Sequence, residues 1–162
     1  MKSNNRKLAL MGLFCAVAII FGYVESLIPV FAGIPGIKLG LANLSVLFIL
    51  MRYSIKEALL VSAVRILVIG FLFGNMFSIA YSLAGAVLSL TVMALLKRTG
   101  KVSVFAISMA GGISHNIGQL IVACFIVENR SLLFYAPVLI ISGILTGAVI
   151  GFLTSETLKR IR

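Results

Sequence analysis

The sequence predicts an all-α, polytopic membrane protein, a single bundle of six transmembrane helices that takes up the whole of residues 1–162. Three observations predict this fold class. Hydrophobic residues make up 61% of the chain and charged residues 11%, whereas about 25% of a soluble domain is charged. The apolar residues form long runs, and the basic residues gather at the ends of these runs. Lipid accepts so much apolar surface, which a soluble core of this size could not bury.

Six apolar segments are the predicted spans, in chain order residues 8–28, 39–51, 58–73, 76–96, 102–127 and 132–153. A helix needs about 20 apolar residues to cross the hydrocarbon core. The first segment reaches this length and exceeds the apolar region of a secretory signal, so we expect a retained span. The second and third are short for independent spans, and we expect them to tilt or to be buried within the bundle. Proline, glycine and asparagine mark the breaks between the segments.

The basic residues predict the orientation of these spans. With the N-terminus in the cytoplasm, the outer loops hold only Lys38 and Arg130, and Arg65 lies within a span. All other basic residues then face inward: Lys2, Arg6, Lys7, Arg52, Lys56, Lys97, Arg98, Lys101, Lys159, Arg160 and Arg162. This asymmetry predicts a multi-pass protein of the cell membrane with both termini cytoplasmic. The net charge of +10 therefore reflects topology, and we expect no nucleic-acid partner.

Polar and ionisable residues within the spans are candidates for function, because lipid makes them costly to keep. A rise of 1.5 Å per residue places Arg65 near the middle of its span. The other candidates map to the outer half: Glu25, Lys38, Asn43, Asn75, His115, Asn116 and Gln119. The inner half holds little that is polar beyond serine and threonine. We interpret this asymmetry as a solute-binding pocket that is open to the outside and sealed below.

Each candidate also has a structural alternative. His115 and Gln119 share a helix face, and a hydrogen-bond clamp between helices explains them as well as a binding site does. Arg65 binds an anionic group on the solute, or it pairs with Glu25 for structural reasons only. Lys38 could simply mark a membrane interface, and Asn75 is placed to cap the helix that follows it.

Small residues recur at helical spacing on two spans. Gly12 and Ala16 form a small-x-x-x-small step in the first span, and Gly143, Gly147 and Gly151 form two such steps in the last. Such steps let helices approach closely. Packing within the bundle explains the steps of the last span, whereas the step of the first span is a candidate contact for a partner protein.

Two sequence runs resemble a known family. They are residues 34–43 (IPGIKLGLAN) and 112–119 (GISHNIGQ), accompanied by Arg65, the turn at residues 73–75 and Tyr135-Ala136-Pro137. They are similar to the heptaprenyl diphosphate synthase component I family, over nearly the whole chain. That family is grouped with the Gx transporters, a superfamily that includes the substrate-binding S components of energy-coupling factor (ECF) vitamin transporters.

The resemblance implies a six-helix bundle that binds a small molecule near its outer face. In S components, a small-x-x-x-small motif on the first helix contacts a transmembrane coupling subunit, and Gly12 and Ala16 occupy the matching place. Two cytoplasmic ATPase subunits would then supply the energy. This chain has no nucleotide-binding motif of its own.

Two functions of different class follow. The first is an S-component-like subunit that captures a small amphipathic, anionic solute, such as an isoprenoid or quinone precursor or a vitamin-like molecule. The second is a non-catalytic membrane component of a heptaprenyl diphosphate synthase. Prenyl elongation uses aspartate-rich motifs that hold Mg²⁺, and this chain has no Asp. We therefore expect no enzyme activity, no cofactor and no metal site, and we interpret Cys15 and Cys124 as packing residues.

Overall fold

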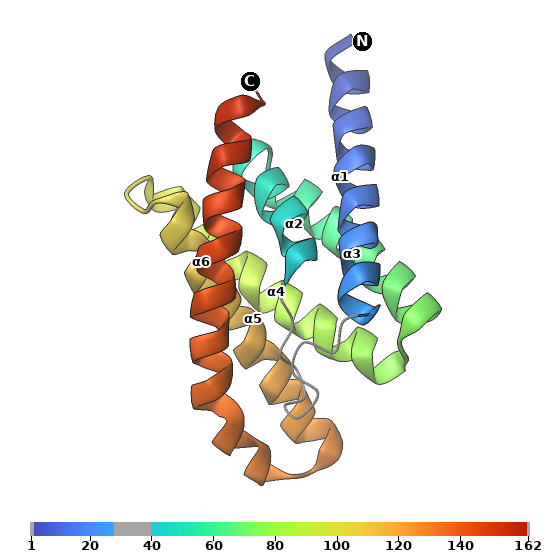
Figure 1. Cartoon of the computed structure of the whole chain (residues 1–162), viewed down its shortest axis with the longest axis vertical. Coiled ribbons are helices and arrows are strands. Elements are labelled where there is room, and N and C mark those ends of the chain that lie inside the picture. The colour runs from blue at the N-terminus through green and yellow to red at the C-terminus, as the bar shows by residue number, and fades with distance from the viewer. Residues whose placement is uncertain (1, 28–39, 162) are drawn as a thin grey trace.

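The computed structural model describes the backbone of residues 2–27 and 40–161, and the side chains from residue 5 onward. Lys38 and the proline- and glycine-rich residues 33–36 therefore lie outside the described residues. The described chain forms six α-helices and one short 3-10 helix, and it contains no strand (Figure 1). In chain order they are α1 (Lys2–Leu27), α2 (Leu41–Arg52), α3 (Ile55–Phe73), α4 (Met76–Thr99), α5 (Val104–Val127), η1 (Arg130–Tyr135) and α6 (Ala136–Arg160).

Polar residues at the breaks explain where several helices begin. The Ser54 hydroxyl accepts a hydrogen bond from the first turn of α3, and Ser103 does the same for α5. Asn75 begins α4 with a capping box, in which its side chain and that of Ser78 each bond to the other residue's backbone N–H. Gly100 ends α4 in the left-handed region, with φ at 65°. The expected cap at Asn75 is thus confirmed.

The helices form two groups of three. The helices α1, α2 and α3 contact one another, while α5 packs against both α4 and α6. Contacts of α3 with α4 and of α2 with α6 join the groups. Figure 1 accordingly shows α2 between α1 and α6. The space between the two groups is where the candidate site lies.

Glycines bring α5 and α6 into close contact. A Cβ on Gly143 would lie 2.8 Å from backbone atoms of Gly112, and one on Gly147 would lie 2.7 Å from Met109 Cα. A Cβ on Gly151 would similarly lie 2.9 Å from Phe105 Cα. The glycine steps of the last predicted span therefore pack within the bundle, as expected, and only glycine permits this approach of the backbones.

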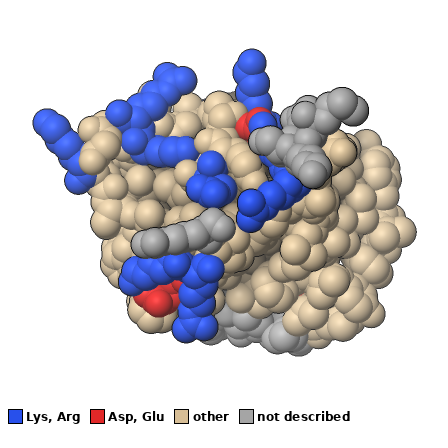
Figure 2. Space-filling model, turned by 90° about the horizontal axis from the view of Figure 1, so that it is seen from above, with Lys and Arg blue, Asp and Glu red and all other residues tan. Residues whose placement is uncertain are grey.

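One end of the molecule carries most of the basic residues, and we call it the basic end. The start of α1, the α2–α3 and α4–α5 connections and the end of α6 all lie there, so both ends of the described chain are on the same side (Figure 1). Viewed from this side, lysine and arginine side chains gather over one part of the surface, and the rest is uncharged (Figure 2). Lys7 pairs with Glu57, and Lys97 donates to the Leu50 carbonyl at 2.5 Å and to that of Tyr53 at 3.2 Å.

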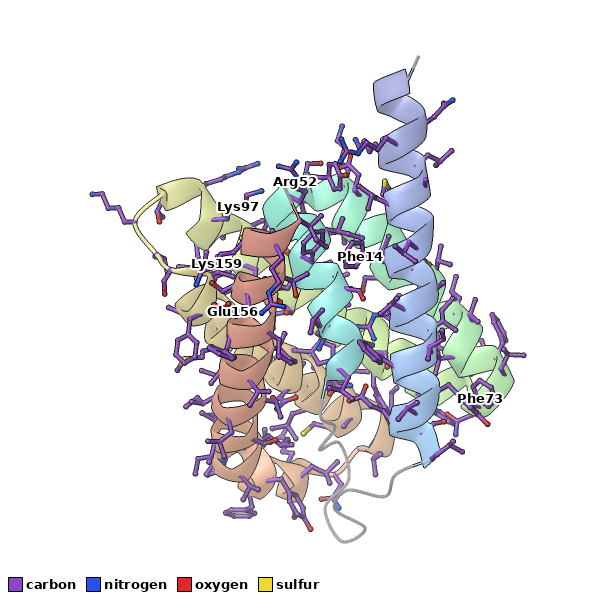
Figure 3. The ribbon with its side chains drawn as sticks, turned by 45° about the horizontal axis from the view of Figure 1, so that its top comes forward. Phe14, Arg52, Phe73, Lys97, Glu156 and Lys159 are labelled. Carbon is purple, nitrogen blue, oxygen red and sulfur yellow. The ribbon has the colours of Figure 1, made fainter. Side chains whose placement is uncertain are left out.

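The largest apolar core lies behind the basic end. Phe14 stacks on Phe48, with ring centroids 4.2 Å apart. Figure 3 shows Phe14 near the labelled basic residues, while Phe73 lies at the opposite end of the molecule. The buried members of this core are Phe14, Val46, Leu47, Phe48, Ile49, Leu50, Ala58, Val61, Leu90, Met93, Ile107 and Ile150. Three of its members, Leu47, Met93 and Ile150, also line the cavity described below.

The exterior is apolar, as expected of an integral membrane protein. Large side chains such as Phe71 and Phe125 are exposed, and lipid is the solvent that such a surface needs. In the described chain, four segments are long and apolar enough to cross a membrane: Asn5–Leu27, Met76–Thr99, Val104–Val127 and Arg130–Arg160. At 12 residues, α2 is about 18 Å long and mostly buried among its neighbours. This fits the expectation that the second segment is a buried one.

Candidate functional site

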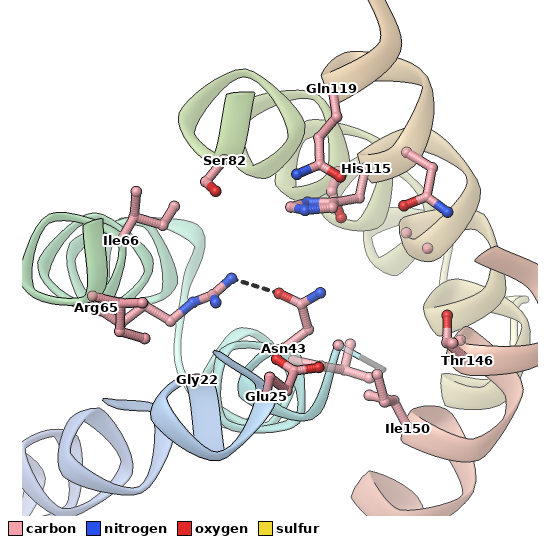
Figure 4. Close-up of a pocket in the computed structure, with 18 of the residues that line it drawn as sticks. Gly22, Glu25, Asn43, Arg65, Ile66, Ser82, His115, Gln119, Thr146 and Ile150 are labelled. Atoms are coloured by element: carbon pink, nitrogen blue, oxygen red, sulfur yellow. Dashed lines mark hydrogen bonds between the residues drawn. The ribbon is translucent and has the colours of Figure 1, made fainter. Parts of the chain in front are cut away.

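A cavity of about 230 Å³ lies between the two groups of helices. Every α-helix contributes to its lining, and polar side chains surround the open space from several directions (Figure 4). The polar residues that line it are Glu25, Ser26, Asn43, Arg65, Ser78, Ser82, Ser89, Ser108, His115, Asn116, Gln119 and Thr146. The volume lies somewhat below the roughly 300–1,000 Å³ typical of ligand pockets, so the cavity suits a small ligand.

Arg65 supplies the positive charge of the cavity. Its guanidinium reaches from α3 toward α2, and one terminal nitrogen donates to Asn43 Oδ1 at 2.6 Å (Figure 4). Its Nε–H is buried and has no hydrogen-bond partner among the described residues. A buried donor left unpaired costs about 1–3 kcal/mol, and such groups normally have a partner. Because this nitrogen is itself buried, a ligand in the cavity would meet the terminal nitrogens of the guanidinium, which face the open space (Figure 4).

Glu25 supplies a negative charge from α1. Its Oε1 accepts a hydrogen bond of 3.1 Å from the backbone N–H of Leu41. The preceding residue, Gly40, lies in the left-handed region with φ at 71° and has no side chain with which to cap α2. Glu25 therefore caps α2 from another helix and places a carboxylate at the helix N-terminus, where the helix dipole favours it.

The two opposite charges do not form an ion pair with each other. Among the described residues, the ion pairs within 4.0 Å join Lys7 to Glu57 and Lys159 to Glu156. Glu25 is still near enough to Arg65 to interact with it electrostatically. The structural alternative for Arg65, a pair with Glu25 alone, is therefore not the arrangement observed. Arg65 bonds to Asn43 instead, and the cavity keeps both charges along its wall.

His115 and Gln119 face the cavity from α5, opposite Arg65 and Asn43 (Figure 4). Gly85 on α4 permits this arrangement, because a Cβ there would lie 2.8 Å from the His115 carbonyl oxygen and 2.9 Å from Gln119 Cγ. The predicted common face of the two side chains therefore points into the cavity. An imidazole and an amide there can each donate and accept hydrogen bonds.

Three other predicted site residues have different positions. Asn116 borders the cavity, but its Nδ2 donates to the Leu139 carbonyl at 2.7 Å and so ties α5 to α6. Asn75 caps α4 and does not line the cavity. Lys38 lies outside the described residues. The described polar centre thus consists of Glu25, Asn43, Arg65, His115 and Gln119.

Sequence reasoning missed the hydroxyl groups of the cavity wall. Ser78, Ser82 and Ser89 line it from α4, while Ser108 and Thr146 do so from α5 and α6. Serine is common in membrane helices, where it can bond to its own backbone, so single hydroxyls attract little attention. Their spacing on α4 was the available signal, since positions four and eleven apart lie on one face of a helix.

Apolar side chains and two serines, Ser89 and Ser108, line the part of the cavity nearest the basic end. Leu47, Met93 and Ile150 line its wall and also belong to the core behind the basic end. The residues of the described polar centre are therefore farther from the basic end than these side chains. No group of three or more His, Cys, Asp or Glu residues that could hold a metal ion occurs in the described part of the chain. Both cysteines are free thiols.

Comparison with known proteins gives one match. A family model described as heptaprenyl diphosphate synthase component I matches residues 14–157. The match covers most of the 162-residue chain and includes the described polar residues of the cavity. The chain matches no curated protein and no solved structure.

Proposed function

The chain belongs to the heptaprenyl diphosphate synthase component I family, and from this premise we propose that it is a membrane solute-binding subunit. It resembles an S component of an ECF transporter and captures a small amphipathic, anionic solute from the outside. An isoprenoid or quinone precursor, or a vitamin-like molecule, is the class of solute that this proposal names. The chain itself carries out no chemical step.

The observation that carries the proposal is the Arg65 guanidinium on the wall of a polar cavity, opposite His115 and Gln119 (Figure 4). A helix bundle that served only as a scaffold has no need to keep an arginine there, because charged side chains are costly within a membrane. The side chains around the guanidinium are the few polar groups that a small-molecule site needs to orient its ligand.

The orientation of the chain completes the proposal. We propose that all six helices cross or enter the membrane, with the basic end in the cytoplasm, as the positive-inside rule requires. The cavity then lies on the outer side of the apolar core. His115, Gln119, Asn43 and Arg65 would contact the solute, and Lys38 and Glu25 belong to the same outer half.

Energy for release of the solute would come from a partner protein, and α1 offers a surface to which this partner could bind. Gly12 and Ala16 are exposed on α1, and a Cβ on Gly12 would meet nothing within 4 Å. Packing within the bundle therefore does not occupy this step of small residues. We propose that it contacts a transmembrane coupling subunit, which works with two ATPase subunits.

The family name supports a second candidate, a non-catalytic membrane component associated with heptaprenyl diphosphate synthase. In this case the chain would anchor a soluble prenyltransferase to the membrane. The absence of Asp from the sequence argues against a catalytic role by the Mg²⁺-dependent route. A membrane anchor, however, gives no reason for Arg65, Glu25 and His115 to line one polar cavity.

The test is to purify the full chain in detergent and identify co-purifying small molecules by mass spectrometry. We expect a bound solute, and we expect Arg65→Ala to retain about 30-fold less of it, because the variant removes a buried charged partner. Arg130→Ala is the matched control, since Arg130 is exposed. Absence of a solute, together with tight co-purification of a soluble prenyltransferase, would support the anchor instead.

A further inference from the structure

The cavity holds two fixed charges of opposite sign that are kept apart. Arg65 and Glu25 both line it, and no ion pair within 4.0 Å joins them. In a membrane interior, two opposite charges that served only structure would gain most by direct contact. Instead, one guanidinium nitrogen of Arg65 donates a hydrogen bond to Asn43 Oδ1. One oxygen of Glu25 accepts a hydrogen bond from the Leu41 N–H.

Each charged group has bonding capacity left for a ligand. The guanidinium of Arg65 carries two terminal nitrogens with two N–H groups each, and its hydrogen bond to Asn43 uses only one of these groups. A carboxylate offers two oxygens with about four acceptor positions, and the hydrogen bond from the Leu41 N–H uses only Oε1 of Glu25. A ligand therefore meets a donor on α3 and an acceptor on α1 within one small cavity.

We propose that the ligand is a small zwitterion that carries a carboxylate and an ammonium group. This inference rests on the proposed solute-binding function, but it replaces the anionic solute named there with a zwitterionic one. The carboxylate binds the Arg65 guanidinium, which matches its planar geometry, and the ammonium group faces Glu25. Asn43, His115 and Gln119 then hydrogen-bond to the remainder of the ligand.

A purely anionic ligand fits these charges less well. A diphosphate or a simple carboxylate bound at Arg65 would also face the Glu25 carboxylate in the same cavity, and like charges placed together are unfavourable. The cavity volume of about 230 Å³ also restricts the ligand to a small molecule, since pockets for larger ligands reach about 1,000 Å³. A long prenyl chain would not be enclosed.

The experiment measures binding to the purified full chain by thermal shift and calorimetry. The probes are α-, β- and γ-amino acids, their N-acetyl derivatives, which keep only the negative charge, and their methyl esters, which keep only the positive charge. Isopentenyl diphosphate is the fourth class. We expect one or more free amino acids to bind and both blocked forms of the same molecule to bind about 30-fold or more weakly.

Variants at Glu25 and Arg65 test which charged group of the ligand each residue binds. Glu25→Gln keeps an oxygen that can cap α2, so the helix should remain folded while the preference for the free amine over the N-acetyl form disappears. Glu128→Gln makes the same chemical change at an exposed residue and should leave binding unchanged. Arg65→Gln should remove binding of every probe.

The outcomes separate this inference from the function on which it rests. Preferential binding of an N-acetyl derivative or of isopentenyl diphosphate would overturn the zwitterion and leave a solute-binding protein. An unchanged preference in Glu25→Gln would also overturn it, because Glu25 would then be a helix cap only. If no probe binds and no molecule co-purifies with the chain, both proposals are wrong.

Discussion

At the scale of single residues, a few polar groups both stabilise the fold and line the cavity. Glu25 caps α2 through Leu41 and also lines the cavity. Asn43 accepts a hydrogen bond from the Arg65 guanidinium and lines the same cavity. Because polar groups are costly in lipid, a residue that both holds the fold and faces the cavity limits how many such groups the bundle must accommodate. The described polar centre is therefore part of the structure as well as a candidate site.

The ion pair at the basic end allows a prediction about pH. Hydrogen bonds from Lys7 and Ser54 lower the pKa of Glu57, which lies outside the predicted spans, to about 2. The ordinary value is about 4.3, so the pair contributes its full stability above that pH and loses it as the pH falls toward 2. We expect Glu57→Gln to lower the free energy of unfolding at pH 7 by no more than about 1 kcal/mol, because the pair is near the surface.

Thermal unfolding in detergent at a series of pH values checks this prediction. The difference between wild type and Glu57→Gln should shrink between about pH 4.3 and about pH 2. Glu128→Gln, for which no partner is described, should behave as wild type throughout. A difference that stays constant over this range would show that the ion pair does not stabilise the fold.

At the scale of helices, two similar sequence patterns have opposite surroundings. The glycines of α6 meet the backbone of α5, whereas Gly12 and Ala16 on α1 are exposed. Helical spacing predicts that small residues share a face, but it does not say whether that face meets a helix of the same chain. The structure resolves this point, since α1 packs on α2 and α3 with its other side.

We predict that Gly143→Ala and Gly12→Leu have different effects. A Cβ at Gly143 would lie 2.8 Å from backbone atoms of Gly112, so this small change should destabilise the fold by about 1–3 kcal/mol. The larger change at Gly12 should leave thermal stability and solute retention unchanged while abolishing co-purification with a tagged coupling subunit.

Val87→Leu is the control for added bulk, because Val87 is likewise exposed on a long helix. It should affect neither stability nor co-purification. Loss of solute retention in Gly12→Leu would mean that this face supports the fold of the bundle, and the proposed docking role would then be abandoned.

At the scale of the whole molecule, charge and polarity divide the bundle along its length. The basic end lies on one side (Figures 1 and 2), the large core lies next to it, and the described polar centre lies farther from that end. We propose above, from the positive-inside rule, that the basic end faces the cytoplasm. In that orientation the described polar centre lies on the outer side, where it would exchange solute with the outside.

Labelling of single cysteines tests this orientation. In a background with Cys15 and Cys124 replaced by Ala, a membrane-impermeant maleimide should label Arg130→Cys on intact cells. Lys101→Cys and Lys159→Cys should react only after the membrane is permeabilised. Labelling of Lys101→Cys on intact cells would reverse the assignment, and labelling of Lys101→Cys and Lys159→Cys from opposite sides would contradict the even number of crossings.

The sequence by itself determined the membrane class, the order and approximate bounds of the helices, the family and the gathering of charge at the ends of apolar runs. These properties depend on composition and on local signals, such as the serine and asparagine caps. The tertiary structure alone decided that Glu25 caps α2, that Arg65 bonds to Asn43 and that Asn116 ties α5 to α6. Spacing along one helix predicts which residues share a face, but which faces meet depends on the packing of distant segments, here set largely by glycines.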